Sequence, residues 1–161
     1  MITLYQFKHS AFCLKTRMAL HAKNLTYRIE EISPAVGQIE IFKISGQKQL
    51  PVIMDDNGQV ISDSSNICEY IDTKNANNPL FPLDPMECSQ SKIIEDWADT
   101  TMAAVCKQAL IKSALENPQL RAALLPNDIP SSIRGIFEKL PFNNLSKLSN
   151  IVLSNKTNIE L

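Results

Sequence analysis

The sequence predicts a mixed α/β domain followed by an all-helical region. Across residues 1–75, short apolar runs typical of strands alternate with segments of helical periodicity. The proline-rich stretch NNPLFPLDP ends this alternation, and the residues after it are typical of helices alone. We therefore expect an α/β domain over residues 1–75, a linker over residues 76–84 and a helical domain over residues 85–161.

The first predicted elements are a strand, a helix and a second strand. The run ITLYQF is short, apolar and aromatic, which is typical of a buried strand. Ser10 can cap the helix that follows, and LTYRIEEI alternates apolar and polar residues as a second strand does. The apolar residues that recur at helical spacing between them are Leu14, Met18 and Ala22. Two strands joined so closely through a helix form a right-handed crossover and run parallel.

The remaining elements of this domain are a helix, a hairpin and a last helix. A helical stretch follows Pro34 and ends near Gly46. The segment QLPVIMDDNGQVIS predicts two strands, Val52–Met54 and Gln59–Ser62, around an Asn-Gly turn. The residues that share one face of the last helix are Ile67, Tyr70 and Ile71. The order β-α-β-α-β-β-α predicts a mixed sheet covered by helices, the arrangement of a thioredoxin-like domain.

The helical region begins with a strong start pattern. Asp84 is a good N-cap, Pro85 fits the first turn, and Glu87 stands three residues after the cap. We expect one helix from this point to Asn117. Its expected buried residues are Ile93, Ile94, Trp97, Val105 and Leu110. Further short helices are predicted over residues 120–125 and 131–140.

Composition and charge exclude several classes of function. Basic and acidic residues number 16 and 17 and are intermixed, so there is no basic face for nucleic acid. No apolar run approaches the roughly 20 residues that span a bilayer, and the N-terminus lacks the features of a secretory signal. The four cysteines are scattered, which favours free thiols over disulfides or a metal site. We therefore expect a cytoplasmic protein with no metal, no nucleic-acid partner and no membrane partner.

Residues 10–13, Ser-Ala-Phe-Cys, are the first candidate site. They stand at a strand-to-helix turn, where backbone N–H groups favour a nearby anion such as a thiolate. The Ser10 hydroxyl could donate a further hydrogen bond to that anion. The alternative interpretation is structural, because serine is a preferred N-cap.

Two further segments are candidate binding residues. Pro51, just before a strand, could follow a cis peptide bond and expose the preceding backbone to a peptide-like ligand; a trans proline at an edge strand is the alternative. Asp63 and Ser64 stand at another helix start. They suit either ordinary capping or capture of an amino acid, with Asp63 on its ammonium and Ser64 on its carboxylate.

The order of these three segments resembles the glutathione transferase superfamily. The matching stretches are HSAFCLKTR, GQKQLPVI and ISDSSNICEYI, which span most of residues 1–75. HSAFCLKTRM and GQKQLPVI are also similar to the larger, transferase-like glutaredoxins, whose first segment carries Cys-Pro-Tyr-Cys. The resemblance implies a thioredoxin-like domain followed by a helical one.

The resemblance also implies residue roles. Ser10 matches the thiol-activating hydroxyl of serine-type transferases, and Cys13 matches the second cysteine of the glutaredoxin motif. The positions that match glutathione-binding residues are Gln49, Leu50, Pro51, Asp63 and Ser64. Glutathione would be a co-substrate, and a homodimer is implied. Relative to the family the helical region is short, with 77 residues from residue 85 onward, so we expect a truncated helical domain.

Three functions remain open on these grounds. The first is a glutathione transferase for detoxification, in which the activated thiol attacks a small hydrophobic electrophile. The second is a non-catalytic glutathione-binding or interaction module. The third is a monothiol glutaredoxin-like reductase that uses Cys13. The missing first cysteine removes the attacking thiol of a dithiol mechanism and favours Ser10 as the catalytic residue.

Overall fold

The computed structural model describes residues 1–32, 37–76, 78–124 and 135. The chain divides into two compact units, of which the first runs from Met1 to Ala104 and the second begins at Val105. No helix of the described residues is long and apolar enough to cross a membrane.

The first unit is built on a four-stranded mixed sheet in the order β2-β1-β3-β4. Its strands are β1 (Ile2–Gln6), β2 (Tyr27–Glu31), β3 (Val52–Met54) and β4 (Val60–Ser62). Strand β1 pairs with β2 in parallel and with β3 antiparallel, and β3 and β4 form the antiparallel hairpin. The predicted crossover, the hairpin and the thioredoxin-like order of elements are confirmed.

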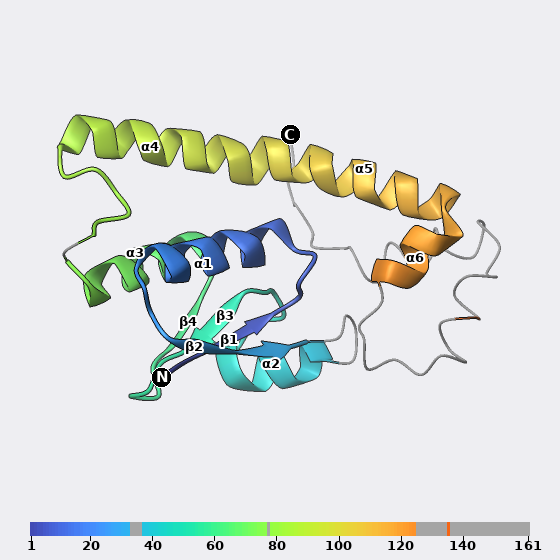
Figure 1. The fold of residues 1–161 in the computed structure, drawn as a ribbon, viewed down its shortest axis with the longest axis horizontal. Helices are drawn as coiled ribbons and strands as arrows, with labels where there is room; N and C mark the ends of the chain where they lie inside the picture. The colour runs from blue at the N-terminus through green and yellow to red at the C-terminus, as the bar shows by residue number, and fades with distance from the viewer. Residues whose placement is uncertain (33–36, 77, 125–134, 136–161) are drawn as a thin grey trace. The chain divides into compact units, whose positions relative to one another are not determined.

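Three helices cover the two faces of this sheet. Helices α1 (Ala11–Ala22) and α3 (Ser64–Lys74) lie on one face and α2 (Gly37–Ser45) on the other (Figure 1). Alternate residues of β1 serve the two faces: Leu4 packs toward α1 and α3, and Tyr5 toward α2.

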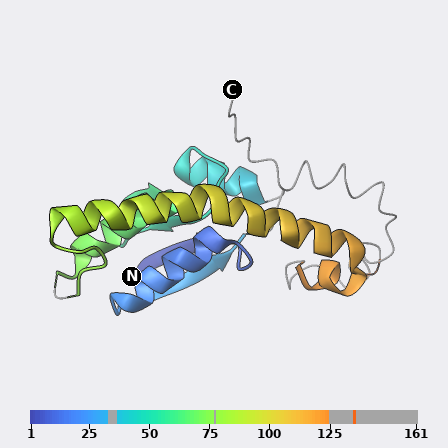
Figure 2. The same ribbon diagram turned by 90° about the horizontal axis from the view of Figure 1, so that it is seen from above.

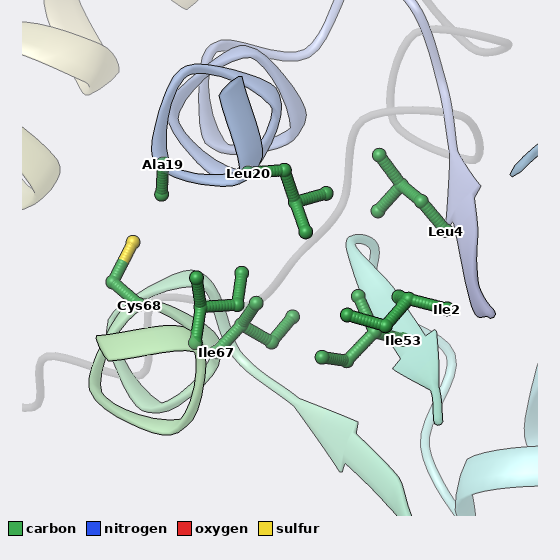
Figure 3. Close-up of a cluster of buried hydrophobic side chains, with 8 residues drawn as sticks. Ile2, Leu4, Ala19, Leu20, Ile53, Ile67 and Cys68 are labelled. Carbon is green, nitrogen blue, oxygen red and sulfur yellow. The ribbon is translucent and has the colours of Figure 1, made fainter. Parts of the chain in front are cut away.

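The larger core lies between the sheet and the pair α1–α3. Figure 3 shows its side chains pointing toward one another from β1, α1, β3 and α3. The buried members are Ile2, Leu4, Ala19, Leu20, Ile53, Ile67, Cys68 and Ile71. A smaller core under α2 contains Tyr5, Ile32, Ile41 and Val52. Burial of this apolar surface is the main stabilising term for the α/β fold.

The buried face of α1 differs from the apolar pattern of its sequence. Leu14 and Met18 are 48% and 64% exposed, whereas Cys13 and Thr16 are fully buried. The Thr16 hydroxyl donates to the Phe12 carbonyl at 3.3 Å, so a polar residue is satisfied without solvent. The core side of the helix therefore holds Cys13 and Thr16 together with Ala19 and Leu20.

The helices after the linker are α4 (Pro85–Trp97), η1 (Ala98–Met102), α5 (Ala103–Glu116) and α6 (Pro118–Leu124). Asp84 caps α4 as predicted and accepts from Met86 N and Glu87 N, each at 3.0 Å. The ribbon passes from α4 into η1 without a break (Figure 2). The segment η1 is π-helical, and α5 continues from it to Glu116, so the predicted helix up to Asn117 is confirmed, with a π-helical segment inside it.

Asn117 ends this helix and caps α6, accepting from Gln119 N at 2.9 Å and Leu120 N at 3.1 Å. A short helix predicted over residues 120–125 is present, although it begins earlier, at Pro118. The helix predicted over 131–140 lies outside the described residues, except for residue 135.

The expected buried residues of the long helix are exposed. Their exposed fractions are 70% for Ile93, 64% for Ile94, 54% for Trp97, 61% for Val105 and 38% for Leu110. Periodicity groups residues on one side of a helix, but it does not supply a partner that would bury that side.

Candidate functional site

The strand register brings the predicted site segments to one edge of the sheet. Tyr5 is opposite Val52, and Val52 is opposite Ser62. The carboxyl ends of β1 and β4 therefore meet the amino end of β3. Because Ser10 follows β1, and Asp63 follows β4, the segments 10–13, 49–51 and 63–64 all emerge at this edge. We call it the site edge.

Ser10 is the N-cap of α1. Its Oγ accepts from Cys13 N at 3.4 Å, and its own N–H donates to the Phe7 carbonyl at 2.9 Å. An accepting hydroxyl keeps its proton, so Ser10 can still donate outward. The first N–H groups of α1 have no carbonyl partner within the helix and add positive potential. The arrangement therefore suits an anion.

Cys13 lies one turn further along α1 and is fully buried. Burial raises the pKa of its thiol, and hydrogen bonds with the Phe7 backbone and the Ser10 side chain only partly offset this effect. A buried neutral thiol is the opposite of the exposed thiolate that attacks disulfides.

The Leu50–Pro51 peptide bond is cis, as the functional interpretation of this segment required. Pro51 is buried, Leu50 packs partly against the core under α2, and Gln49 is exposed. The exposed Gln49 side chain, close to the start of β3, is thus available to a ligand, and Leu50 can offer its backbone groups.

Asp63 has an unusual backbone, with φ 73° and ψ 130°. A non-glycine residue at positive φ costs about 1–3 kcal/mol and tends to occur where function requires it. Its Oδ1 accepts from Ser65 N at 2.9 Å and Asn66 N at 3.2 Å, and no described residue pairs with Oδ2. Ser64 is almost fully buried at 4% exposure. One carboxylate oxygen thus caps α3, and the other remains for a ligand.

A charged cluster beside Asp63 was missed by the sequence analysis. Lys15 Nζ lies 2.9 Å from Ser65 Oγ, 2.7 Å from Asp99 Oδ2 and 2.5 Å from Glu95 Oε1. Burial by itself lowers the pKa of Lys15, but hydrogen bonds to Asp99 and Glu95 outweigh it and raise the pKa above its ordinary value. The partners are 50 to 84 residues away in sequence, so local spacing could not identify them.

A second missed network braces the loop that leads to Ser10. Arg17 Nη1 donates to Gln6 Oε1 at 2.5 Å, and Gln6 Nε2 donates to Glu31 Oε2 at 3.0 Å. Glu31 Oε1 accepts from Lys8 N at 2.6 Å. These bonds join the ends of β1 and β2 to α1 and hold residues 7–9 in place. Among the described residues no group of three or more His, Cys, Asp or Glu could hold a metal ion.

Comparison with known proteins agrees with this geometry. The family model of the glutathione S-transferase N-terminal domain matches residues 9–74, which contain all the predicted site residues. The chain is 26% identical over 146 residues to a stringent starvation protein A homolog of Pasteurella multocida (strain Pm70), covering 88% of this chain and 65% of that relative. It is 30% identical over 113 residues to glutathione S-transferase U2 of Arabidopsis thaliana, covering 70% of this chain and 50% of that one.

Solved structures share the fold. Glutaredoxin 2 from Salmonella typhimurium, solved in complex with glutathione, superposes with a TM-score of 0.58 at 21% identity, over 92% of this chain and 65% of that one. This chain therefore spans about half to two thirds of the length of these relatives. Residues 9–74 therefore match the N-terminal domain of the glutathione transferase superfamily.

Proposed function

We propose that the chain binds glutathione along the site edge and activates its thiol for attack on a small hydrophobic electrophile. The observation that carries this proposal is the register of the sheet, which gathers Ser10, the cis Leu50–Pro51 peptide and Asp63–Ser64 at one edge. The three segments offer a hydroxyl donor, an exposed backbone and a carboxylate–hydroxyl pair. Glutathione, a tripeptide with a thiol in its middle residue, has a group that suits each of them.

The γ-glutamyl end of glutathione would bind at the start of α3. Its carboxylate would accept from the Ser64 hydroxyl and the helix N-terminus, and its ammonium would meet Asp63 Oδ2. The backbone of Leu50 would pair with the cysteinyl residue, ahead of Pro51, and Gln49 would meet the glycyl end.

The thiol would then lie near the start of α1. Donation from Ser10 and the positive potential of the helix N-terminus favour the thiolate over the thiol. A pKa reduction from about 8.5 to about 6.5 corresponds to roughly 2.7 kcal/mol, which two or three good donors can supply. The thiolate sulfur forms a bond to the electrophilic carbon, and the leaving group departs with the electron pair of its former bond.

Calorimetric titration of glutathione into the full chain tests the binding. Ser64→Ala removes one hydrogen bond to a charged group and should weaken binding about 10-fold or more. Ser113→Ala, at an exposed position of α5, is the matched control and should bind as the wild type does. Absence of binding to the folded wild type, or equal affinity in the Ser64 variant, would overturn the proposed site.

A second candidate function is glutathione binding without turnover. It is supported by the 88% coverage of this chain in the match to a stringent starvation protein A homolog, whose name is not that of a transferase. An electrophile screen separates the two functions, because only the transferase consumes glutathione, at a rate that Ser10→Ala lowers. The Cys13 reductase finds no support in a fully buried thiol of raised pKa.

We further propose a cytoplasmic homodimer, as the family resemblance implies. Sedimentation equilibrium of the purified chain tests the dimer directly, and a monomer across the micromolar range would contradict it.

A further inference from the structure

We infer that Lys15 is a positioning residue for the γ-glutamyl end of glutathione. This inference rests on the proposed function and concerns a residue that would not itself touch the ligand. Lys15 lies on α1, the helix that Ser10 caps, and it reaches both α3 and the segment from Glu95 to Asp99. It thus links the thiol end of the proposed site to its γ-glutamyl end within the first compact unit.

The contacts of Lys15 are partly shielded from solvent. Its side chain is 23% exposed, and those of Glu95 and Asp99 are 21% and 25% exposed. Such pairs are screened less than fully exposed ones, and each carboxylate also needs the cation to offset the other's charge. Removal of Lys15 would leave two neighbouring carboxylates without their shared cation.

Ser65 connects this cluster to the binding turn. Its Oγ accepts from Lys15 Nζ at 2.9 Å and lies 3.4 Å from Asp99 Oδ2. Its backbone N–H donates to Asp63 Oδ1 at 2.9 Å. Ser65 is therefore held from both its side chain and its backbone. Because its N–H orients the Asp63 carboxylate, a shift of Ser65 would turn Oδ2 away from the ammonium it is proposed to bind.

The helix that supplies the two acids changes form at this contact. Glu95 lies in the last turn of α4, and Asp99 lies in η1. π-Helical segments inside longer helices are rare overall, and many of those that do occur lie at functional sites. Here it occurs where the helix meets Lys15 and Ser65.

A second lysine provides a matched control. Lys92 on α4 lies 2.5 Å from Glu69 on α3, so it also joins these two helices through an ion pair. Its side chain is 48% exposed and that of Glu69 is 53% exposed, and no hydrogen bond or ion pair of the described residues joins either one to Asp63 or Ser65. A loss of binding caused only by a loosened α3–α4 contact would appear equally in both variants.

The test compares two ligands on four proteins. Glutathione and N-acetylcysteinylglycine, which lacks the γ-glutamyl group, are titrated into the wild type, Lys15→Met, Lys15→Arg and Lys92→Met. We expect Lys15→Met to weaken glutathione about 10-fold and N-acetylcysteinylglycine by less than about twofold. Lys15→Arg should restore most of the affinity, and Lys92→Met should bind as the wild type does.

Four results would overturn the inference. Wild-type affinity for glutathione in Lys15→Met would show that Lys15 has no role, and an equal loss of both ligands would show a general structural role. A wild type that does not bind glutathione would overturn the proposed function, and the inference with it. If Lys15→Met does not fold, Ser65→Ala tests the same link with the ion pairs intact, and unchanged glutathione affinity in that variant would overturn the link.

Discussion

The α/β part of the chain and the helices after the linker differ in how they bury apolar side chains. Two clusters of buried residues hold the sheet between its helices, whereas α4, α5 and α6 contain no buried residue among those the structure describes. Ile67 on α3 is fully buried, and Ile94 on α4 is 64% exposed. The proposed glutathione contacts therefore rest on a self-supporting core.

The largest loss of stability should come from a substitution of Lys23, which joins the packed region to the segment that follows α3. Its side chain is fully buried, and its Nζ bonds to Asp72 Oδ1 and Asn78 O at 2.6 Å each and to the Asn75 carbonyl. Lys23→Met would remove the buried cation that these three acceptors share, which leaves the Asp72 carboxylate without its counter-charge, and should destabilise the protein by about 3–5 kcal/mol in urea unfolding. Lys43→Met, at an exposed position of α2, should change stability by less than about 0.5 kcal/mol. A loss of stability in Lys23→Met as small as that in Lys43→Met would show that the segment after α3 is not part of the packed region.

A matched pair of isoleucines tests the comparison itself. Ile67→Ala removes a fully buried side chain from the main core and should cost about 2–5 kcal/mol. Ile94→Ala truncates a largely exposed one and should cost less than about 1 kcal/mol. Urea denaturation followed by circular dichroism measures both. Equal losses would show that α4 is packed in solution and would remove the contrast.

The packed region should also show a defined acid sensitivity. Burial alone raises the pKa of Asp55, but bonds from Lys74, Tyr70 and Asp56 N outweigh it and hold that pKa well below its ordinary range. Burial likewise raises the pKa of Asp72, but the hydrogen bond from Lys23 outweighs this effect, so that the pKa of Asp72 is lowered overall.

A depressed carboxyl pKa contributes stability that is fully present above the unfolded value of about 3.9 and is lost as the pH falls through the folded value. We expect the urea concentration at the unfolding midpoint to decrease as the pH is lowered below about 4. The decrease should be smaller in Asp55→Asn than in the wild type. An Asp55→Asn variant with the wild-type acid dependence would show that Asp55 is not the group responsible.

Ser10 is expected to affect stability less than Lys23 or Ile67 does. Ser10→Ala removes the cap of α1 and should cost about 0.5–2 kcal/mol. The same variant should raise the pKa of bound glutathione toward about 8.5, because the donor to the thiolate is gone. Ultraviolet absorbance of the thiolate across a pH titration measures this shift. A bound thiol with the same pKa in both proteins would contradict the role of Ser10 and leave its capping role.

Local patterns in the sequence were sufficient for much of the fold and part of the site. The run ITLYQF, the Asn-Gly turn and the Asp84 cap each depend on neighbouring residues, and each is found where it was predicted. The sequence left both the cis and the trans form open for the bond before Pro51, but the capping by Asp63 belongs to this group as well. Such features need only short-range geometry.

Features that depend on distant partners were not predictable in this way. Leu14 and Met18 suggest a buried face on α1, but the crossover turns Cys13 and Thr16 toward the core instead. The contacts of Lys15 join residues up to 84 positions apart, and the exposure of Ile94 depends on what covers α4. Periodicity reports which residues share a face, and tertiary packing decides whether that face is buried.

The central claim is that glutathione binds at the edge of the sheet where β1 and β4 end, and the two edges of the same sheet provide the contrast. Amide chemical shifts of the labelled full chain, recorded during titration with glutathione, test it most directly. The account predicts that the largest shifts occur at Leu50, Ser64 and Ser65, with little change at the opposite edge in the turn Asp55–Gly58. Shifts confined to that turn, or none at saturating glutathione, would contradict it.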